Sequence, residues 1–453
     1  MRRLRAFCSI VLFAIAATQI LSMTASASGA ETAQGDVHNL TAPRNYEGPP
    51  LSLANAIEEA LNKNPDLMAL RQQVDIARHR PTQERALNPP MLEGTIWQWP
   101  INTLNPANTN MYMFMVGQDF PGRGKRDLRA AVAEKDIALA DSDVVIRARQ
   151  IVNDIRQAYT SLYIARKAID IHLATVSLLQ QIADVSQAKY ATGRISQQDV
   201  LKPVLELSKL HSDIIMFDEQ ASLATAKLNV LLDRSPDAPI GPLVEPQEQM
   251  LLPSSADLQR MALEHQPELQ RAHLEIDRAE AELASAKKEY KPDFTVQGGY
   301  LVMPNQTDAL LGRVGITWPK APWSRGKVDA RVAEQTAAVA AATARERAME
   351  NSLRLAVQEA YVRAKSAQAR AALLRTTILP QSQQTLDVSQ IAYETDRVDF
   401  QALIDNERTL LDSRLDYYRA VNDFEQAIAD LERAIGTDLQ EGTVTAVVEH
   451  EGH

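Results

Sequence analysis

The chain repeats itself, and this duplication constrains its fold more than any other feature of the sequence. The segment Ala60–Leu67 (ALNKNPDL) matches Ala262–Leu269 (ALEHQPEL) at an offset of 202 residues. The same offset relates Arg123-Gly124-Lys125 to Arg325-Gly326-Lys327, and Ala158-Tyr159 to Ala360-Tyr361. An offset that is kept over so much of the chain indicates two copies of one structural unit.

The two copies occupy residues 51–235 and 253–437. Between them we place a linker over 236–252, because the run SPDAPIGP that begins at Ser235 is too rich in proline and glycine for a helix. Residues 28–50 form an N-terminal extension ahead of the first copy. The tail 438–453 is short and polar, and we predict that it is disordered.

Residues 1–27 have the pattern of a secretory signal peptide. Arg2, Arg3 and Arg5 precede an apolar run from Phe7 to Ile20, and Ala25-Ser26-Ala27 provides a small-residue cleavage site. An uncleaved anchor is the alternative, although the run is short for a membrane span. The only cysteine, Cys8, lies in this segment, so the predicted mature chain has no thiol.

The charge of the predicted mature chain argues against a nucleic-acid partner. Removal of Arg2, Arg3 and Arg5 leaves 45 of the 48 basic residues against 58 acidic ones, a net charge of −13. A nucleic-acid-binding chain would instead carry a basic surface.

Each copy contains two long helical stretches. A heptad stripe at Ile151, Ile155, Ala158, Leu162 and Ala165, with spacings of 4, 3, 4 and 3, is typical of helices packed as in coiled coils. The predicted long helices span 124–190 and 196–234 in the first copy, and 326–393 and 400–436 in the second. The first of each pair would be roughly 100 Å long at about 1.5 Å per residue. Pro380 is expected to break or kink its helix. Shorter helices near 53–87 and 256–289 begin the two copies.

Between the short and the long helices, each copy has two predicted strands, at 92–99 and 111–120 and at 293–301 and 310–318. Phe294, Val296 and Tyr300 alternate with Thr295 and Gln297, as in strands of a transmembrane barrel. Four strands are too few to close a barrel, whereas three copies of the chain would supply twelve. A periplasmic sandwich is the alternative. Aromatic residues suited to the interfacial girdles are Trp97, Trp99, Tyr112, Tyr300 and Trp318.

The order of three motifs, present twice, resembles TolC-type outer-membrane efflux proteins over residues 51–437. The first motif is Ala60–Leu67 and its copy. The second is a strand that ends in proline before a Gly-Lys pair, as in Phe120–Lys125. The third is Tyr-x-x-Gly, found as Tyr190–Gly193 and, with aspartate in place of glycine, as Tyr393–Asp396. A methionine-rich strand also resembles the heavy-metal efflux branch of that family.

The resemblance implies a mainly α fold with a small β part, in which three chains form a 12-stranded outer-membrane β-barrel and a periplasmic α-helical barrel. It implies an outer-membrane channel of a tripartite efflux system, with a periplasmic adaptor and an inner-membrane pump as partners and outer-membrane lipid around the barrel. Cargo would pass passively and could include Cu- or Ag-type ions. No cofactor is expected. The alternative is a periplasmic coiled-coil adaptor or scaffold, which would lack duplicated amphipathic strands.

The resemblance also assigns candidate site residues at the periplasmic end of the helices. Gly193, Arg194, Asp396 and Arg397 fall in the turns that contact the adaptor in that family. Asp405 takes the position of one of two aperture aspartates, and Ala402 takes the other. Asp199 lies at the matching place in the first copy. Solvated carboxylates on a helix surface are the alternative interpretation of both aspartates.

Met111, Met113 and Met115 alternate with Tyr112, Phe114 and Val116 along one strand. When Pro121 is matched to Pro319, Met115 corresponds to Arg313 on the polar, lumenal face. The three methionines are therefore candidate lumenal contacts for soft metals such as Cu(I) or Ag(I). The alternative is that they are apolar filler, and a slip of one residue in the register would turn them toward lipid.

Nothing in the sequence favours an enzyme. It contains no phosphate-binding loop, no G-x-S-x-G and no Cys-His pair, and its eight histidines form no H-E-x-x-H set. We therefore predict no catalytic residue and assign no metal site of the enzyme type.

Overall fold

The computed structural model describes residues 46–102, 105, 108–245, 253–304, 306–395 and 397–439. These residues belong to the compact unit that begins at Asn45. The predicted signal peptide, most of the tail and Asp396 lie outside them.

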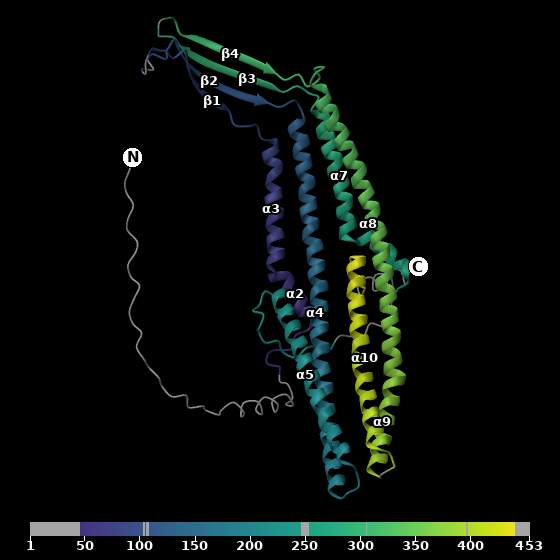
Figure 1. Cartoon of the computed structure of the whole chain (residues 1–453). Helices are drawn as coiled ribbons and strands as arrows, with labels where there is room; N and C mark the ends of the chain where they lie inside the picture. The colour runs from purple at the N-terminus through teal and green to yellow at the C-terminus, as the bar shows by residue number, and fades with distance from the viewer. Residues whose placement is uncertain are drawn as a thin grey trace, which may run out of the picture. The chain divides into compact units, whose positions relative to one another are not determined.

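Helices and strands follow one another in the same order twice (Figure 1). The first repeat contains α2 (Leu53–Lys63), α3 (Pro65–Arg85), β1 (Met91–Trp97), β2 (Met111–Phe120), α4 (Lys125–Ala191) and α5 (Gln197–Leu231). The second contains α6 (Ser255–His265), α7 (Pro267–Lys288), β3 (Phe294–Val302), β4 (Ala309–Ile316), α8 (Arg325–Leu373), the π-helical turn η2 (Leu374–Ile378), α9 (Leu379–Glu394) and α10 (Phe400–Ile435).

The short helix expected at the start of each repeat is in fact a pair of helices. The break falls at Asn64-Pro65 in the first repeat and at Gln266-Pro267 in the second, because proline is favourable at the first turn of a helix and disruptive inside one. The Asn64 amide donates to the Leu231 carbonyl at 3.2 Å, and that of Gln266 donates to the Arg433 carbonyl at 2.9 Å. The repeated motif therefore ties each short helix to the end of the last helix of its repeat.

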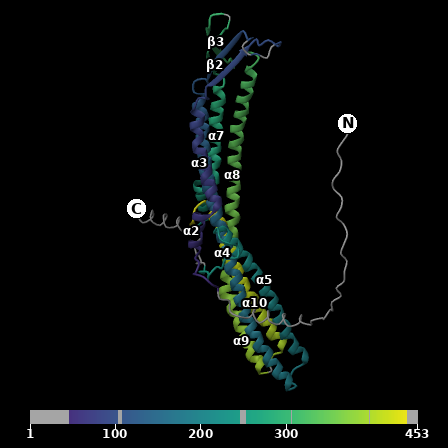
Figure 2. The same cartoon turned by 90° about the vertical axis from the view of Figure 1, so that its left-hand side faces the viewer.

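Close to the strands, the helices form a single row in which α3 packs on α4, α4 on α7, and α7 on α8 (Figures 1 and 2). Ion pairs connect the two repeats along the α4–α7 seam: Lys135–Asp277 at 2.7 Å, Arg278–Asp136 at 2.5 Å and Arg271–Asp143 at 2.6 Å. The buried side chains of this region are mainly alanines: Ala77, Ala130, Ala133, Ala272, Ala279, Ala286 and Ala342. Small residues and ion pairs thus hold the row together.

Farther from the strands, the helices pack around three apolar clusters: one among α2, α4 and α5, one among α6, α8 and α10, and one among α4, α5, α9 and α10. Two clusters are related by the duplication, since Ile151, Ile155 and Ala158 in one correspond to Leu353, Val357 and Ala360 in the other. The third joins the ends of the α4–α5 and α9–α10 hairpins and has no duplicate. The heptad stripe of the sequence is therefore the buried stripe of the long helices.

The helix expected over 326–393 is neither straight nor broken at Pro380. It continues through the π-helical turn Leu374–Ile378 into α9, where Pro380 occupies the first turn. A proline has no N–H to donate to the preceding turn, and both proline and single π-helical turns occur where long helices bend.

The four strands form one antiparallel sheet in the order β1-β2-β3-β4, so the second strand of the first repeat pairs with the first strand of the second. Strands β1 and β4 are the two edges. Among the described residues, no helix is both long enough and apolar enough to cross a membrane.

The junction of sheet and helices depends on one ion pair between the repeats. Lys125, the buried first residue of α4, donates from Nζ to Asp293 Oδ1 at 2.7 Å. The Gly122 N–H donates to the same oxygen at 2.6 Å. Asp293 directly precedes β3, so this contact fixes the turn that follows β2 against the start of β3.

We predict that Asp293→Ala destabilises the protein by about 2–3 kcal/mol, because it leaves the Lys125 ammonium buried without an acceptor. The cost falls short of that of a fully buried pair because the Asp293 side chain is 41% exposed. Denaturant unfolding in detergent measures the effect. The double variant Asp293→Ala/Lys125→Met should recover most of the loss, and a single variant as stable as the parent would contradict the assignment.

Candidate functional site: a two-faced sheet and a helical tip

The pairing register gives the sheet two chemically different faces, because directly opposed residues of neighbouring strands lie on the same side. One face carries exposed apolar side chains on all four strands, with Gln118 of β2, opposite Val296, as its polar member. Its apolar members are Leu92, Ile96, Phe114, Val116, Phe120, Phe294, Val296, Tyr300, Leu310, Val314 and Ile316. A soluble protein rarely exposes so large an apolar surface, so this face requires a covering.

Met111, Met113 and Met115 lie on the other face. Met115 is opposite Glu93 on β1 and Gly299 on β3, and its Sδ occupies the space that a side chain at position 299 would need. Gln297 and Arg313 are paired on the same face. Met91, which the sequence analysis passed over, also lies there, opposite Gly117. Four thioethers thus share this face with two carboxylates, Glu93 and Asp119, and the Arg313 guanidinium.

The aromatic residues proposed for girdles divide between the two faces. Tyr112 and Tyr300 belong to the apolar face, whereas Trp97 pairs with Met111 and therefore lies on the methionine face. Trp318 lies just beyond β4 and packs edge-on against Trp323, with ring centroids 6.2 Å apart. Among these five, Trp97 is the one whose strand position opposes a girdle role.

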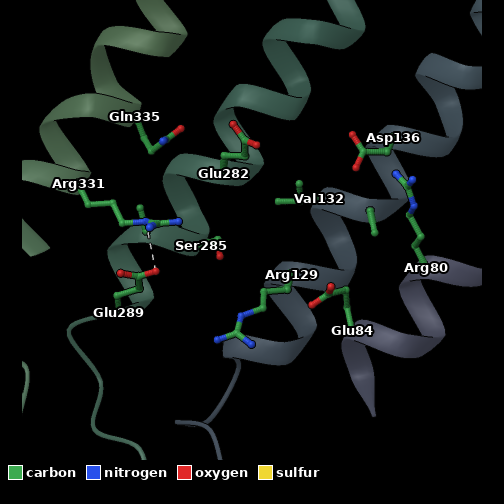
Figure 3. A pocket seen from close by; sticks show the side chains of 12 residues that line it. Arg80, Glu84, Arg129, Val132, Asp136, Glu282, Ser285, Glu289, Arg331 and Gln335 are labelled. Carbon is green, nitrogen blue, oxygen red and sulfur yellow. Dashed lines mark ion pairs between the residues drawn. The ribbon is translucent and has the colours of Figure 1, made fainter. Parts of the chain in front are cut away.

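A charged cleft of about 420 Å³ crosses the row of helices near the sheet (Figure 3). It is lined by basic and acidic side chains from all four helices: Arg80 and Glu84 of α3, Arg129 and Asp136 of α4, Glu282 of α7 with Glu289 just after its end, and Arg331 of α8. Arg331 and Glu289 form an ion pair at 3.3 Å. The lining is of mixed charge and continues the ion-paired packing of the row.

At the opposite end, the turns between the long helices form the helical tip. Gly193 adopts a left-handed conformation with φ +70°, and the Arg194 N–H donates to the Lys189 carbonyl at 3.0 Å. The second turn has the equivalent bond, from the Arg397 N–H to the Ala392 carbonyl at 2.8 Å. Asp396, the predicted counterpart of Gly193, lies outside the described residues. The other three predicted tip residues, Gly193, Arg194 and Arg397, therefore belong to two turns of the same kind.

The two turns are held together by Lys189 and Tyr393. Lys189 donates from Nζ to the Tyr393 carbonyl at 2.5 Å, and Nζ lies 4.1 Å from the centre of the Tyr393 ring. The Tyr393 hydroxyl is 3.0 Å from Ser186 Oγ. The tyrosine of the second copy of the Tyr-x-x-Gly motif is thus one of the contacts between the hairpins, which the sequence alone did not reveal.

The two predicted aperture aspartates have different surroundings. Asp199 is engaged in a capping box, since its Oδ2 accepts from the Ser196 N–H at 3.3 Å and from the Ser196 hydroxyl at 2.8 Å. The Asp405 side chain is 56% exposed, accepts a hydrogen bond from Gln401 and lies 3.8 Å from Arg408. Asp405 is therefore more available to an ion than Asp199, which stabilises the start of α5.

A buried carboxylate near the tip, Glu407, was not among the residues predicted from the sequence. Glu407 is 4% exposed, and burial, followed by the charge of Glu206, raises its pKa to about 7. Its position between Leu403 and Leu410 in the heptad could have identified it. The part of the chain that the structure describes contains no group of three His, Cys, Asp or Glu residues arranged to hold a metal.

The sequence pattern of the family described as "Outer membrane efflux protein" matches residues 56–233 and 258–437, once in each repeat. The chain belongs to this family. Its outer-membrane location and its role in efflux follow, as the sequence motifs predicted, and so does the mainly α fold with a small sheet. This is a family of efflux proteins rather than enzymes.

Individual proteins agree with this assignment. The cobalt-zinc-cadmium resistance protein CzcC of Cupriavidus metallidurans is 24% identical over 383 residues, which cover 83% of this chain and 87% of that protein. The outer-membrane channel OprN superposes with a TM-score of 0.71 at 18% identity, covering 89% of this chain and 96% of OprN. The outer membrane protein VceC of Vibrio cholerae superposes with a TM-score of 0.71 at 18% identity, covering 85% of this chain and 96% of VceC.

Proposed function

We propose that three copies of this efflux protein assemble into one channel, with a closed barrel of twelve strands in the outer membrane. The observation that carries the proposal is the sheet itself, which has an exposed apolar face and two open edges, β1 and β4. Strand edges in lipid leave backbone groups without partners, so a sheet of four strands must continue into neighbouring chains. OprN, which shares this fold, is itself an outer-membrane channel.

The helices carry surfaces that suit the same assembly. Exposed apolar side chains recur along α5 at Leu201, Val204, Leu205, Ile215, Met216, Leu223 and Val230. A second set lies on α8 and α9 at Leu355, Val362, Leu373, Val388 and Ile391. Since α5 and α9 lie at the two ends of the helical arrangement, the α5 surface of one copy would pack against the α8–α9 surface of the next.

At the tip, we place the contact with a periplasmic adaptor on Gly193, Arg194, Asp396 and Arg397, and an inner-membrane pump would complete the assembly. The turns are exposed, and two of these residues are cationic. Asp405, and less favourably Asp199, would line the aperture. In this proposal the channel itself is passive, and the inner-membrane pump supplies the energy.

For cargo, we propose heavy-metal ions. The relative CzcC is a cobalt-zinc-cadmium resistance protein. In this chain the methionine face would line the lumen, because the opposite, apolar face suits lipid. Thioethers favour soft ions, so Cu(I) and Ag(I) fit this face best, and Glu93 adds a compensating negative charge beside Met115.

The assembly is tested by extracting the full chain from outer membranes in detergent and measuring its mass by light scattering. We expect a trimer, because the two sheet edges and the two apolar helix surfaces need partners. A monomer that is soluble in the periplasm would contradict the proposal and favour the adaptor or scaffold alternative.

For the aperture, we predict that Asp405→Ala lowers cation selectivity in single channels, measured from reversal potentials under a salt gradient. Three exposed carboxylates around a narrow pore attract cations, and their loss removes that field. Asp416→Ala, an exposed position farther along α10, serves as the control and should keep the selectivity of the parent. An unchanged reversal potential in Asp405→Ala would remove Asp405 from the aperture.

For the cargo, we predict that Met113→Leu/Met115→Leu weakens Ag(I) binding to the trimer at least about tenfold, since leucine keeps the volume and removes the sulfur ligand. Titration calorimetry measures affinity, and X-ray absorption reports Ag–S neighbours. Met68→Leu, on the exposed surface of α3, is the matched control. Equal Ag(I) binding by the double variant and the control would rule out the methionine face as a ligand.

A further inference from the structure

Glu407 occupies a position that an apolar residue would be expected to fill. It lies on the buried stripe of α10 with Phe400, Leu403, Ile404 and Leu410 on either side along the helix. That stripe belongs to the apolar cluster that joins the α4–α5 hairpin to the α9–α10 hairpin. In the described part of the chain, the Glu407 carboxylate makes no hydrogen bond and no ion pair. A carboxylate in such a place is expensive to ionise.

The charged groups around Glu407 do not compensate for this burial. Glu206 on α5 and Asp412 on α10 oppose its ionisation, whereas Arg408 and Arg414 on α10 favour it. Arg408 is already bound by Glu206, which also accepts from Lys209 at 3.0 Å. Helices α4 and α9 contribute apolar side chains to the cluster, including Leu179, Ile182 and Leu386. Farther toward the tip, the charge of Lys189 on α4 is directed at Tyr393 of α9. Burial and the charge of Glu206 therefore outweigh the nearby cations and favour the neutral form of Glu407.

The buried carboxylate occurs in the second repeat, and the first repeat has an apolar residue at the equivalent position. At the offset of 203 that relates Tyr190 to Tyr393, the counterpart of Glu407 is Val204. Val204 is 54% exposed, whereas Glu407 is 4% exposed. The same position of the repeat thus holds an exposed apolar side chain on α5 and a buried carboxylate on α10. Ionisation of Glu407 would therefore act on the packed seam between the α4–α5 and α9–α10 hairpins.

We propose that Glu407 is a proton-dependent gating residue: neutral, it packs in the seam between the two hairpins and keeps the tip closed, and ionised, it favours their separation. The proposal rests on the proposed channel function, because separation of the hairpins is what would widen the periplasmic end. Glu407 acts by positioning helices and does not contact cargo.

The direction of the pH effect follows from the two protonation equilibria. The pKa of Glu407 is about 7 in the packed seam and 4.5 for a solvated glutamate. The packed form therefore binds the proton more tightly, and its advantage declines as pH rises from about 4.5 to about 7. Across that interval, the equilibrium between packed and separated hairpins shifts toward separation by at most about 300-fold for each carboxylate. The effect is complete about one pH unit above 7.

The test is the open probability of single full-length trimers in planar bilayers between pH 5 and pH 8.5. The parent should open increasingly as pH rises, with most of the change below about pH 7. Glu407→Gln cannot ionise and should remain at the parent's acid-pH level throughout. Asp416→Asn, an exposed carboxylate of the same helix, should follow the parent. The proposal is overturned if Glu407→Gln keeps the parent's pH dependence, or if the parent shows none.

A second readout follows the hairpins directly. Cys8 is the only cysteine of the sequence, so spin labels can be placed at Gln198→Cys and Gln401→Cys in a Cys8→Ala background. Both positions are exposed at the tip, on α5 and α10. We expect the distance distribution to broaden from pH 5 to pH 8 in the parent and to stay narrow with Glu407→Gln. If parent and variant broaden alike, Glu407 is not the gate. If no trimer conducts at any pH while the distances change as expected, the channel function fails and the proton-dependent seam stands.

Discussion

A row of helices only one helix thick has water on both sides, and the upper part of this protein is organised by that constraint. A thick apolar core cannot form when both faces of the row contact water. Each pair of neighbouring helices is therefore held together by the side chains in the narrow contact between them. Alanine allows the close approach, and long Lys, Arg, Asp and Glu side chains pair across the outside of the contact. Each exposed pair contributes little, so stability comes from the sum along the seam. The charged cleft of Figure 3 is a consequence of this packing.

The sheet obeys the opposite constraint. Its apolar face cannot remain in water, and its two edges cannot remain unpaired in lipid. The ion pair of Lys125 with Asp293 therefore has a wider role than its size suggests, because it connects the start of α4 to the start of β3 and so sets the orientation of the sheet on the row of helices.

The two repeats share one fold, and the residues in which they differ give the protein its specific properties. Asn64 and Gln266 make the same contact from equivalent places, so that contact belongs to the shared fold. The four methionines of the methionine face, by contrast, come from strands of the first repeat, and the buried Glu407 comes from the second. One half thus contributes the soft ligands proposed for cargo and the other the carboxylate proposed for gating.

Much of this could be predicted from the sequence, for a physical reason: periodicity in one dimension reports which side of a helix or strand is buried. The offset of 202 indicated two equivalent units, the heptad stripe through Ile151 and Ile155 indicated the long packed helices, and the alternation around Phe294 indicated two-faced strands. The motif order also identified the family.

Tertiary structure decided what depends on contacts between distant segments. The pairing of β2 with β3 placed the methionines of the first repeat on one face with Gln297 and Arg313 of the second, and the packing of two hairpins brought Lys189 to Tyr393. Burial separated Glu407 from the many solvated carboxylates that look identical in the sequence. Local composition alone could not determine these properties, because the environment of a side chain is set by residues that lie two hundred positions away.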